Sequence, residues 1–171
     1  MRFATSISLV ALAAAAIACD DDRPQLLPTA PLGVAPDAVS AYLAVSNANP
    51  AVGSEVTVFV RARRGSAVGP IGSFTIRLAY DSTRLQFKDA ARSEHGMVMA
   101  NGANAGLLVA AGASATGFTT DDLVAATFVA RATSALTPLE LTVTELNSVT
   151  FTDQKSSVRV ARGLYRDAGS K

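Results

Sequence analysis

The chain has 171 residues, of which 49% are hydrophobic and 17% charged, and this composition excludes an intrinsically disordered acidic or basic protein. Its 15 basic and 14 acidic residues are nearly balanced, so it lacks the general attraction to phosphates on which nucleic-acid-binding proteins depend. With one His, one Cys and no Trp, the chain is a poor candidate for a His/Cys metal centre or for most catalytic constellations.

The N-terminal residues predict export. Arg2 followed by the uncharged run 3–18 has the length of a signal peptide and is short for a membrane span, so we expect residues 1–18 to be removed. Cys19 directly follows small residues and resembles the lipidated cysteine of a bacterial lipoprotein, which would anchor the chain in the inner or the outer membrane of the cell envelope. The alternative is a secreted protein in which Cys19 is a free thiol.

Residues 19–38 predict a flexible tether between this cysteine and a folded domain. The segment contains an acidic triplet at 20–22 and four of the seven prolines, which oppose both helix and sheet. We expect the three carboxylates to be solvated rather than to bind calcium.

From Val39 onward, hydrophobic and polar residues alternate, as is typical of antiparallel strands with one buried face. The clearest runs lie at 55–61, 73–78 and 139–144. The residues predicted to point inward in these runs and in a fourth stripe are Val56, Val58, Val60, Phe74, Ile76, Leu78, Leu139, Leu141, Val143, Val124, Ala126 and Phe128.

Further short strands complete the predicted domain. We expect them near residues 41–45, 85–88, 97–100, 107–111, 149–151 and 158–161. Eight or nine short strands predict an all-β fold, a two-sheet antiparallel β-sandwich of jelly-roll type over residues 39–162. Residues 163–171 are predicted to form a frayed tail.

Four segments of this region resemble, in order, the strand signatures of a cohesin domain. The likeness covers about residues 41–161, and the related cellulose-binding modules share the fold. The segments are a V-G-x-x-V-x-V element at 52–58, a strand that ends in Tyr80 and Asp81 before Leu85 and Phe87, a small-residue turn at 111–117, and a strand at 123–128.

The resemblance implies a non-catalytic, monomeric docking module that binds a dockerin-type partner through one face of a sheet. Calcium is then expected on the partner, and no metal site on this chain. The implied partner-binding residues are Ser73 and Thr75, at the two positions where the family has an Asn and an Asp, Arg77 on the same outward side, and Gly112, where the family has an acidic residue. The alternative is that Ser73, Thr75 and Arg77 only solvate one face of a sheet.

The only histidine gives little support to an enzyme. His95 stands beside Glu94, and adjacent side chains of an extended segment point apart, whereas a catalytic base needs a nucleophile and an orienting group across the fold. No G-x-S-x-G motif is present. We therefore expect no enzymatic activity and an exposed loop position for His95.

Docking of such a partner would link the protein to polysaccharide degradation. Two other functions remain as alternatives to docking. A carbohydrate-binding module would need flat aromatic side chains on its surface, and the aromatic residues expected to be able to face outward are Tyr42, Phe59, Phe118 and Tyr165. A structural subunit of an envelope assembly is the third hypothesis.

Overall fold

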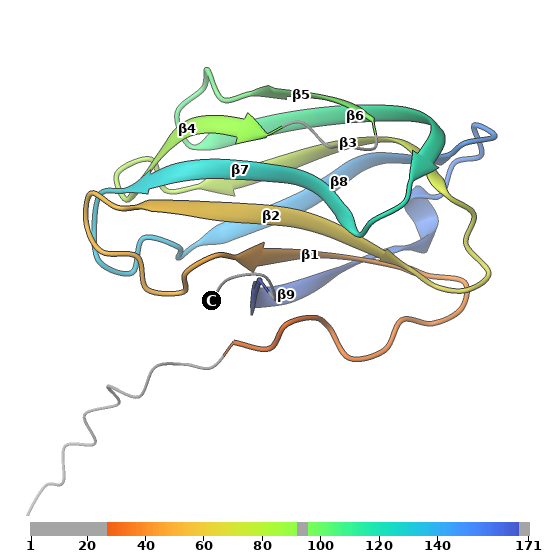
Figure 1. Ribbon diagram of the computed structural model, residues 1–171, viewed down its shortest axis with the longest axis horizontal. Coiled ribbons are helices and arrows are strands. Elements are labelled where there is room, and N and C mark those ends of the chain that lie inside the picture. The colour runs from red at the N-terminus through yellow and green to blue at the C-terminus, as the bar shows by residue number, and fades with distance from the viewer. Residues whose placement is uncertain (1–26, 92–95, 168–171) are drawn as a thin grey trace, which may run out of the picture.

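The computed structural model describes residues 27–91 and 96–167, which form two β-sheets packed face to face (Figure 1). The five-stranded sheet has the order β4-β7-β2-β1-β9 and the four-stranded sheet the order β5-β6-β3-β8, both readable from top to bottom in Figure 1. The elements are β1 Val39–Val45, β2 Glu55–Arg64, β3 Ile71–Tyr80, β4 Leu85–Ala91, β5 Met97–Asn101, β6 Leu107–Phe118, β7 Asp122–Ala130, β8 Leu139–Ser148, the 3-10 turn η1 Lys155–Ser157, and β9 Val158–Arg166.

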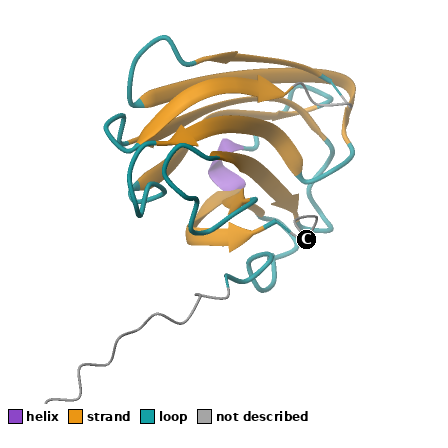
Figure 2. Ribbon diagram, turned by 60° about the vertical axis from the view of Figure 1, so that its left-hand side comes forward, coloured by secondary structure: helices purple, strands orange, loops and turns teal. Residues whose placement is uncertain are grey.

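The predicted all-β sandwich is confirmed. Strands make up most of the described chain, and η1 is the short turn drawn in purple in Figure 2. All neighbouring strands are antiparallel except β1 and β9, which run parallel. Within the described residues, no helix is long and apolar enough to cross a membrane.

The core lies between the two sheets, where the period-two alternation placed it. The predicted inward residues of β2, β3 and β7 are all buried. Edge-to-face aromatic contacts join the sheets and strands, with Phe128 lying 5.1 Å from Tyr80 and 5.7 Å from Phe87 between ring centroids. Burying each such side chain contributes about 1.5–3 kcal/mol to folding, so these inward residues stabilise the sandwich strongly.

The predicted turn at 111–117 is wrong, because β6 continues through Phe118. Small residues were interpreted as a turn, but here they pair with β3, Ser73 standing opposite Ala113 and Ile71 opposite Phe118. A bulge between these pairs absorbs the extra residues of β6, and Gly117 has the positive φ of 90° that a residue with a side chain rarely adopts.

The predicted strand at 149–151 is also wrong, because β8 runs on to Ser148 and a tight turn follows. The buried Ser148 hydroxyl accepts hydrogen bonds from the backbone N–H groups of Thr150 and Thr152, and the Ser148 N–H donates to the Thr152 carbonyl. These bonds bend the chain locally, and a strand at this point would leave the Ser148 hydroxyl without them.

Both ends of the folded domain extend further than expected. Residues 163–166, predicted to begin the tail, belong to β9, where Leu164 pairs with Leu43 of β1. The segment 27–38, predicted as flexible tether, lies along the domain below β9 in Figure 1: Pro28 accepts a backbone hydrogen bond from Arg166. The predicted signal peptide, Cys19, the acidic triplet, His95 and residues 168–171 lie outside the described residues.

Candidate functional site

The outer face of the four-stranded sheet carries the residues singled out on β3 by their alternation. Outward positions of the four strands line up as two rows across the sheet, because the cross-strand partners share the same phase. From β5 through β6 and β3 to β8, one row is Met97, Ala113, Ser73 and Asn147, and the other is Met99, Ala111, Thr75 and Glu145.

The β3–β8 half of this face is polar and internally hydrogen-bonded. The Thr75 hydroxyl donates to the Glu145 carboxylate at 3.2 Å, and the Asn147 amide donates to the same carboxylate at 2.8 Å and to the Ser73 hydroxyl at 3.1 Å. Each side chain is thereby held in one orientation, while the unused lone pairs and donors of these groups stay available to a partner.

The β5–β6 half of the same face is apolar. Met97 and Met99 are each 72% exposed, and the residues opposite them on β6, Ala113 and Ala111, are too small to cover them. The two halves together line a shallow hollow of about 300 Å³. A surface with two uncovered thioethers beside a rigid polar network has the composition of a protein-binding site, in which apolar anchors are combined with directional hydrogen bonds.

The charges of the face are few. Arg77 occupies the next row of β3, opposite Val109 of β6 and Thr142 of β8, and its side chain is exposed. Within the part of the chain that the structure describes, neither Arg77 nor Glu145 forms a salt bridge. Among the described residues, Arg77 and the hydrogen-bonded Glu145 thus place one cation and one carboxylate without a charged partner on this face.

Ser73, Thr75 and Arg77 lie on this outer face, as their alternation predicted, and their binding role stays a prediction. Gly112 does not point the same way. A Cβ at this position would lie 2.5 Å from the Phe74 ring, so the position faces the interior of the sandwich. The outward side chains of β6 are those of its neighbours Ala111 and Ala113, so Gly112 can offer a partner only its backbone, which lines the hollow, and its binding role stays a prediction.

Sequence reasoning missed the contribution of β8 to the face. The alternation of Leu139, Leu141 and Val143, continued by one step, would bury Glu145. The structure has a bulge at Thr144 instead, whose hydroxyl donates to the Thr75 carbonyl, and this shifts Glu145 outward. The sequence contained one signal for this shift. A charged residue such as Glu145 at a position expected to be buried indicates that a bulge reverses the alternation.

Met97 and Met99 were also missed, although the strand that carries them was predicted. Their spacing of two residues on a short strand places both on one side, and Val98 between them is buried. Exposure could not be assigned from this pattern, because methionines at alternate positions are more often core residues than surface residues.

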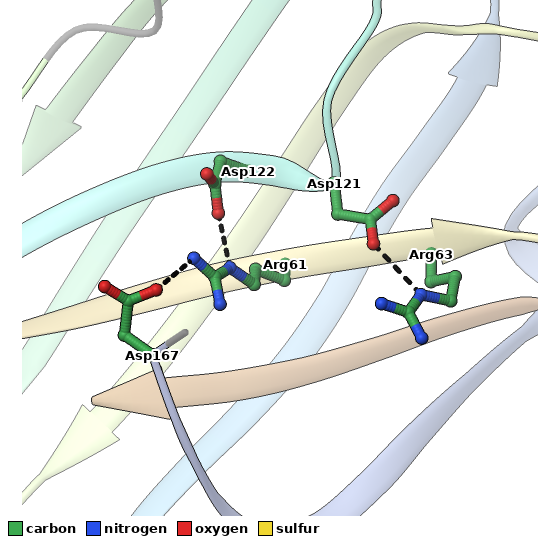
Figure 3. Close-up of polar contacts among 5 residues, drawn as sticks. All are labelled: Arg61, Arg63, Asp121, Asp122 and Asp167. Carbon is green, nitrogen blue, oxygen red and sulfur yellow. Dashed lines mark hydrogen bonds and ion pairs between the residues drawn. The ribbon is translucent and has the colours of Figure 1, made fainter. Parts of the chain in front are cut away.

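A second cluster of charged residues lies on the outer face of the five-stranded sheet (Figure 3). Arg61 of β2 donates hydrogen bonds to Asp122 at 2.5 Å and to Asp167 at 2.7 Å, and Arg63 donates to Asp121 at 3.0 Å. Burial by itself lowers the pKa of Arg61. The hydrogen bonds and charges of Asp122 and Asp167 together outweigh this effect and raise the pKa above its ordinary value, so the guanidinium stays charged.

This cluster has a structural explanation. The carboxylates of Asp121 and Asp122 are directed to arginines, and the described residues hold no group of three acidic, His or Cys side chains that could bind a metal. Tyr42, nearby on β1, is buried and packs edge-to-face on Tyr165 at 5.3 Å. Burial raises the pKa of Tyr42, and the charge of Asp121 adds to the shift.

The aromatic residues expected to be able to face outward do not form a flat platform. Tyr42 and Phe118 are buried, and the Phe59 ring lies beneath the Arg61 guanidinium at 5.0 Å. In the described ranges 27–91 and 96–167, the exposed aromatic side chain is instead Phe151, 88% accessible in the turn after β8. A single exposed ring there does not make the stacking surface that a polysaccharide chain needs.

Comparison with known proteins extends this description. The family described as "Cohesin domain" matches residues 42–162. No curated protein sequence matches the chain.

Solved cohesin structures have the same fold. A type II cohesin domain from the cellulosome of Acetivibrio cellulolyticus aligns with a TM-score of 0.56 at 13% identity, covering 78% of this chain and 97% of that one. From the same organism, a type II cohesin in a complex with an X-dockerin gives 0.55 at 11% identity over 72% and 95% of the two chains.

The sixth cohesin of scaffoldin B from this organism, in complex with a mutant Cel5 dockerin, gives a TM-score of 0.51 at 17% identity over 75% of this chain and 99% of the other. Identities this low support the fold alone. The family match, in contrast, covers well over half of the sequence. The chain therefore belongs to the cohesin family.

Proposed function

We propose that this protein is a non-catalytic docking module that binds a dockerin-type partner on the outer face of its four-stranded sheet. The observation that carries the proposal is the division of that face into an apolar half with Met97 and Met99 and a hydrogen-bonded polar half with Thr75 and Glu145. Membership of the cohesin family supports it, as do the related cohesins that were crystallised with dockerins.

The arrangement suits an amphipathic helix laid across the strands. Apolar side chains of the helix would cover the methionines, which supplies binding energy from burial, and polar side chains would meet the Thr75–Glu145–Asn147 network, which supplies direction. Because the network is already held by its own hydrogen bonds, little side-chain entropy is lost on docking. Calcium would act on the partner by ordering it.

The proposal extends to the setting of the protein. Lipid attached to Cys19 would hold the module at the bacterial cell envelope, and a captured partner carrying a carbohydrate-active enzyme would link it to polysaccharide degradation. Secretion without lipid is the alternative for Cys19.

Binding to purified dockerin modules tests the docking function. The chain from residue 19 onward, with Cys19→Ala to avoid lipid, is immobilised and exposed to a panel of calcium-loaded dockerins. We expect at least one to bind and a chelator to release it. Thr75→Arg should weaken this binding by about 1–2 kcal/mol, because a large cation would be desolvated at the centre of the contact.

Thr127→Arg is the matched control. Thr127 is a half-buried outward threonine in the middle of β7, on the opposite sheet, so the same substitution there should leave binding unchanged. Binding that ignores both the chelator and Thr75→Arg would contradict docking on this face. Retention on insoluble polysaccharide instead of a dockerin would favour a carbohydrate-binding module, and co-purification with membrane proteins alone would favour a structural envelope subunit.

A further inference from the structure

The sulfur-containing side chains of the folded domain are concentrated on one strand. The sequence has three methionines, one cysteine and no tryptophan. Met1 and Cys19 lie in the N-terminal region ahead of the domain, so the domain itself contains two methionines, Met97 and Met99, and both belong to β5. An oxidant that attacks sulfur would therefore act on the folded domain at a single strand.

The geometry leaves both thioethers open to a small molecule. Each methionine is 72% exposed, both lie along the hollow of the outer face, and the side chains opposite them are alanines. Within the four-stranded sheet β5 is an edge strand, paired with β6 only. Val98 between the methionines fills the core, so the sulfur atoms can react without any opening of the domain.

We propose that Met97 and Met99 are a reversible oxidation site for peroxides, and that their oxidation releases the docked partner. This inference rests on the proposed docking function. In the reaction, a sulfur lone pair attacks one oxygen of hydrogen peroxide and the O–O bond breaks. The sulfur gives up two electrons and becomes a sulfoxide, while the peroxide is reduced and its other oxygen leaves as water after proton transfer.

The chemical change falls on the half of the face that binds through apolar contact. A sulfoxide is a strong hydrogen-bond acceptor, and an apolar helix surface packed against it offers no donor, so the S=O group would be buried without a partner. The polar half keeps its hydrogen bonds, because Thr75, Glu145 and Asn147 contain no sulfur. Binding should therefore be weakened while the fold is preserved.

Peroxide treatment of the folded chain from residue 19 onward, carrying Cys19→Ala, tests the site. We expect a gain of two oxygen atoms, about 32 Da, mapped to Met97 and Met99, with no change in the melting temperature. Affinity for a calcium-loaded dockerin should fall at least tenfold. A mixture of the two methionine sulfoxide reductases, one for each sulfoxide epimer, should restore both the mass and the affinity.

The control is the double variant Met97→Leu with Met99→Leu, which keeps the size and apolar character of both side chains. Its affinity for the dockerin is measured before and after peroxide, and the treatment should leave that affinity unchanged, because no thioether is left to oxidise. Unchanged affinity after complete oxidation would overturn the switch, as would peroxide sensitivity in the leucine variant. If no untreated protein binds any dockerin, the docking function fails, and the mapped masses and their reversal by the reductases still decide whether the oxidation site exists.

Discussion

Gly112 is a residue at which the absence of a side chain matters for the core. It lies on β6 directly opposite Phe74, and the ring of Phe74 occupies the space where a Cβ would stand. Phe74 in turn packs edge-to-face on Phe118 with 5.2 Å between ring centroids, and both rings are fully buried. The aromatic pair and the glycine therefore form one unit of the core.

Gly112→Ala is expected to destabilise the protein by about 1–3 kcal/mol, the usual cost of adding a methyl group to a filled core. The new Cβ would meet two atoms of the Phe74 ring at 2.5 and 2.6 Å, and that ring is held in place by Phe118. Urea unfolding followed by circular dichroism measures the change.

Gly69→Ala is the control for this substitution. A Cβ at Gly69 meets nothing closer than 3.7 Å, so stability should change by less than about 0.5 kcal/mol. If Gly112→Ala left stability unchanged and altered only partner binding, Gly112 would be an outward contact after all.

At the scale of elements, Arg61 joins three parts of the five-stranded sheet. From β2 it reaches Asp122 at the start of β7 on one side and Asp167, directly after β9, on the other. The Arg61 and Asp167 side chains are only 13% and 15% exposed, so their charge-assisted hydrogen bond is poorly screened by solvent, whereas Asp122 is half exposed. The backbone N–H of Asp167 also donates to the Val45 carbonyl, which fixes the end of β9 beside β1.

Arg61→Gln should cost about 1–3 kcal/mol of unfolding free energy, because it removes the cation from two carboxylates. The end of β9 should loosen first, which amide hydrogen exchange at residues 164–167 would detect.

Arg63→Gln is the comparison for Arg61→Gln. Arg63 and Asp121 are both about 40% exposed, and an exposed ion pair is worth at most about 1 kcal/mol. If the two variants lost the same unfolding free energy, the burial of the Arg61 side chain would not strengthen its ion pairs.

The strands show which features of the fold could be predicted from sequence. Strict alternation identified β2, β3 and β7 with their buried residues, since burial of one face dictates that pattern. In β6 the run of Ala, Gly and Ser does not alternate between hydrophobic and polar residues, so the sequence did not predict that this run pairs with β3. These residues are extended because neighbouring strands supply their hydrogen bonds, and single-sequence patterns do not contain that information.

The candidate site was predictable only on one strand. Ser73, Thr75 and Arg77 could be placed outward from the alternation of β3 alone. Glu145 required the bulge at Thr144, and a bulge depends on the partner strand. Gly112 was assigned to the site through the family resemblance. A Cβ at this position would point at the Phe74 ring, and this contact joins residues far apart in the sequence, so the sequence pattern could not reveal it.

For the whole molecule, the described N-terminal segment and the candidate docking face lie on different sides. Residues 27–38 run along the β9 edge of the five-stranded sheet and the loop after β2, where the Pro36 carbonyl accepts a hydrogen bond from Ala67. In Figure 1 this segment lies below β9, whereas β5 lies along the top. The described segment 27–38 therefore does not cover the face that we propose for docking.

Lipid attachment is tested by metabolic labelling. Radiolabelled palmitate should enter the wild-type chain expressed in a bacterial host and should not enter Cys19→Ala, because the thiol is the acceptor of the lipid. The wild type should fractionate with membranes and the variant with the soluble fraction. Equal labelling of both chains, or a wild type found only in the soluble fraction, would contradict anchoring and favour secretion.

The pairing of β1 with β9 has a consequence for the time course of folding. β1 lies between β2, its neighbour in sequence, and β9, the last described strand. The five-stranded sheet is therefore complete only when the C-terminal end of the domain is present. Sandwiches built on such long-range pairs fold on the order of milliseconds to seconds. A chain that emerges N-terminus first would hold the β1 edge open until β9 arrives, and during that interval β1 is the strand most exposed to aggregation or capture by a chaperone.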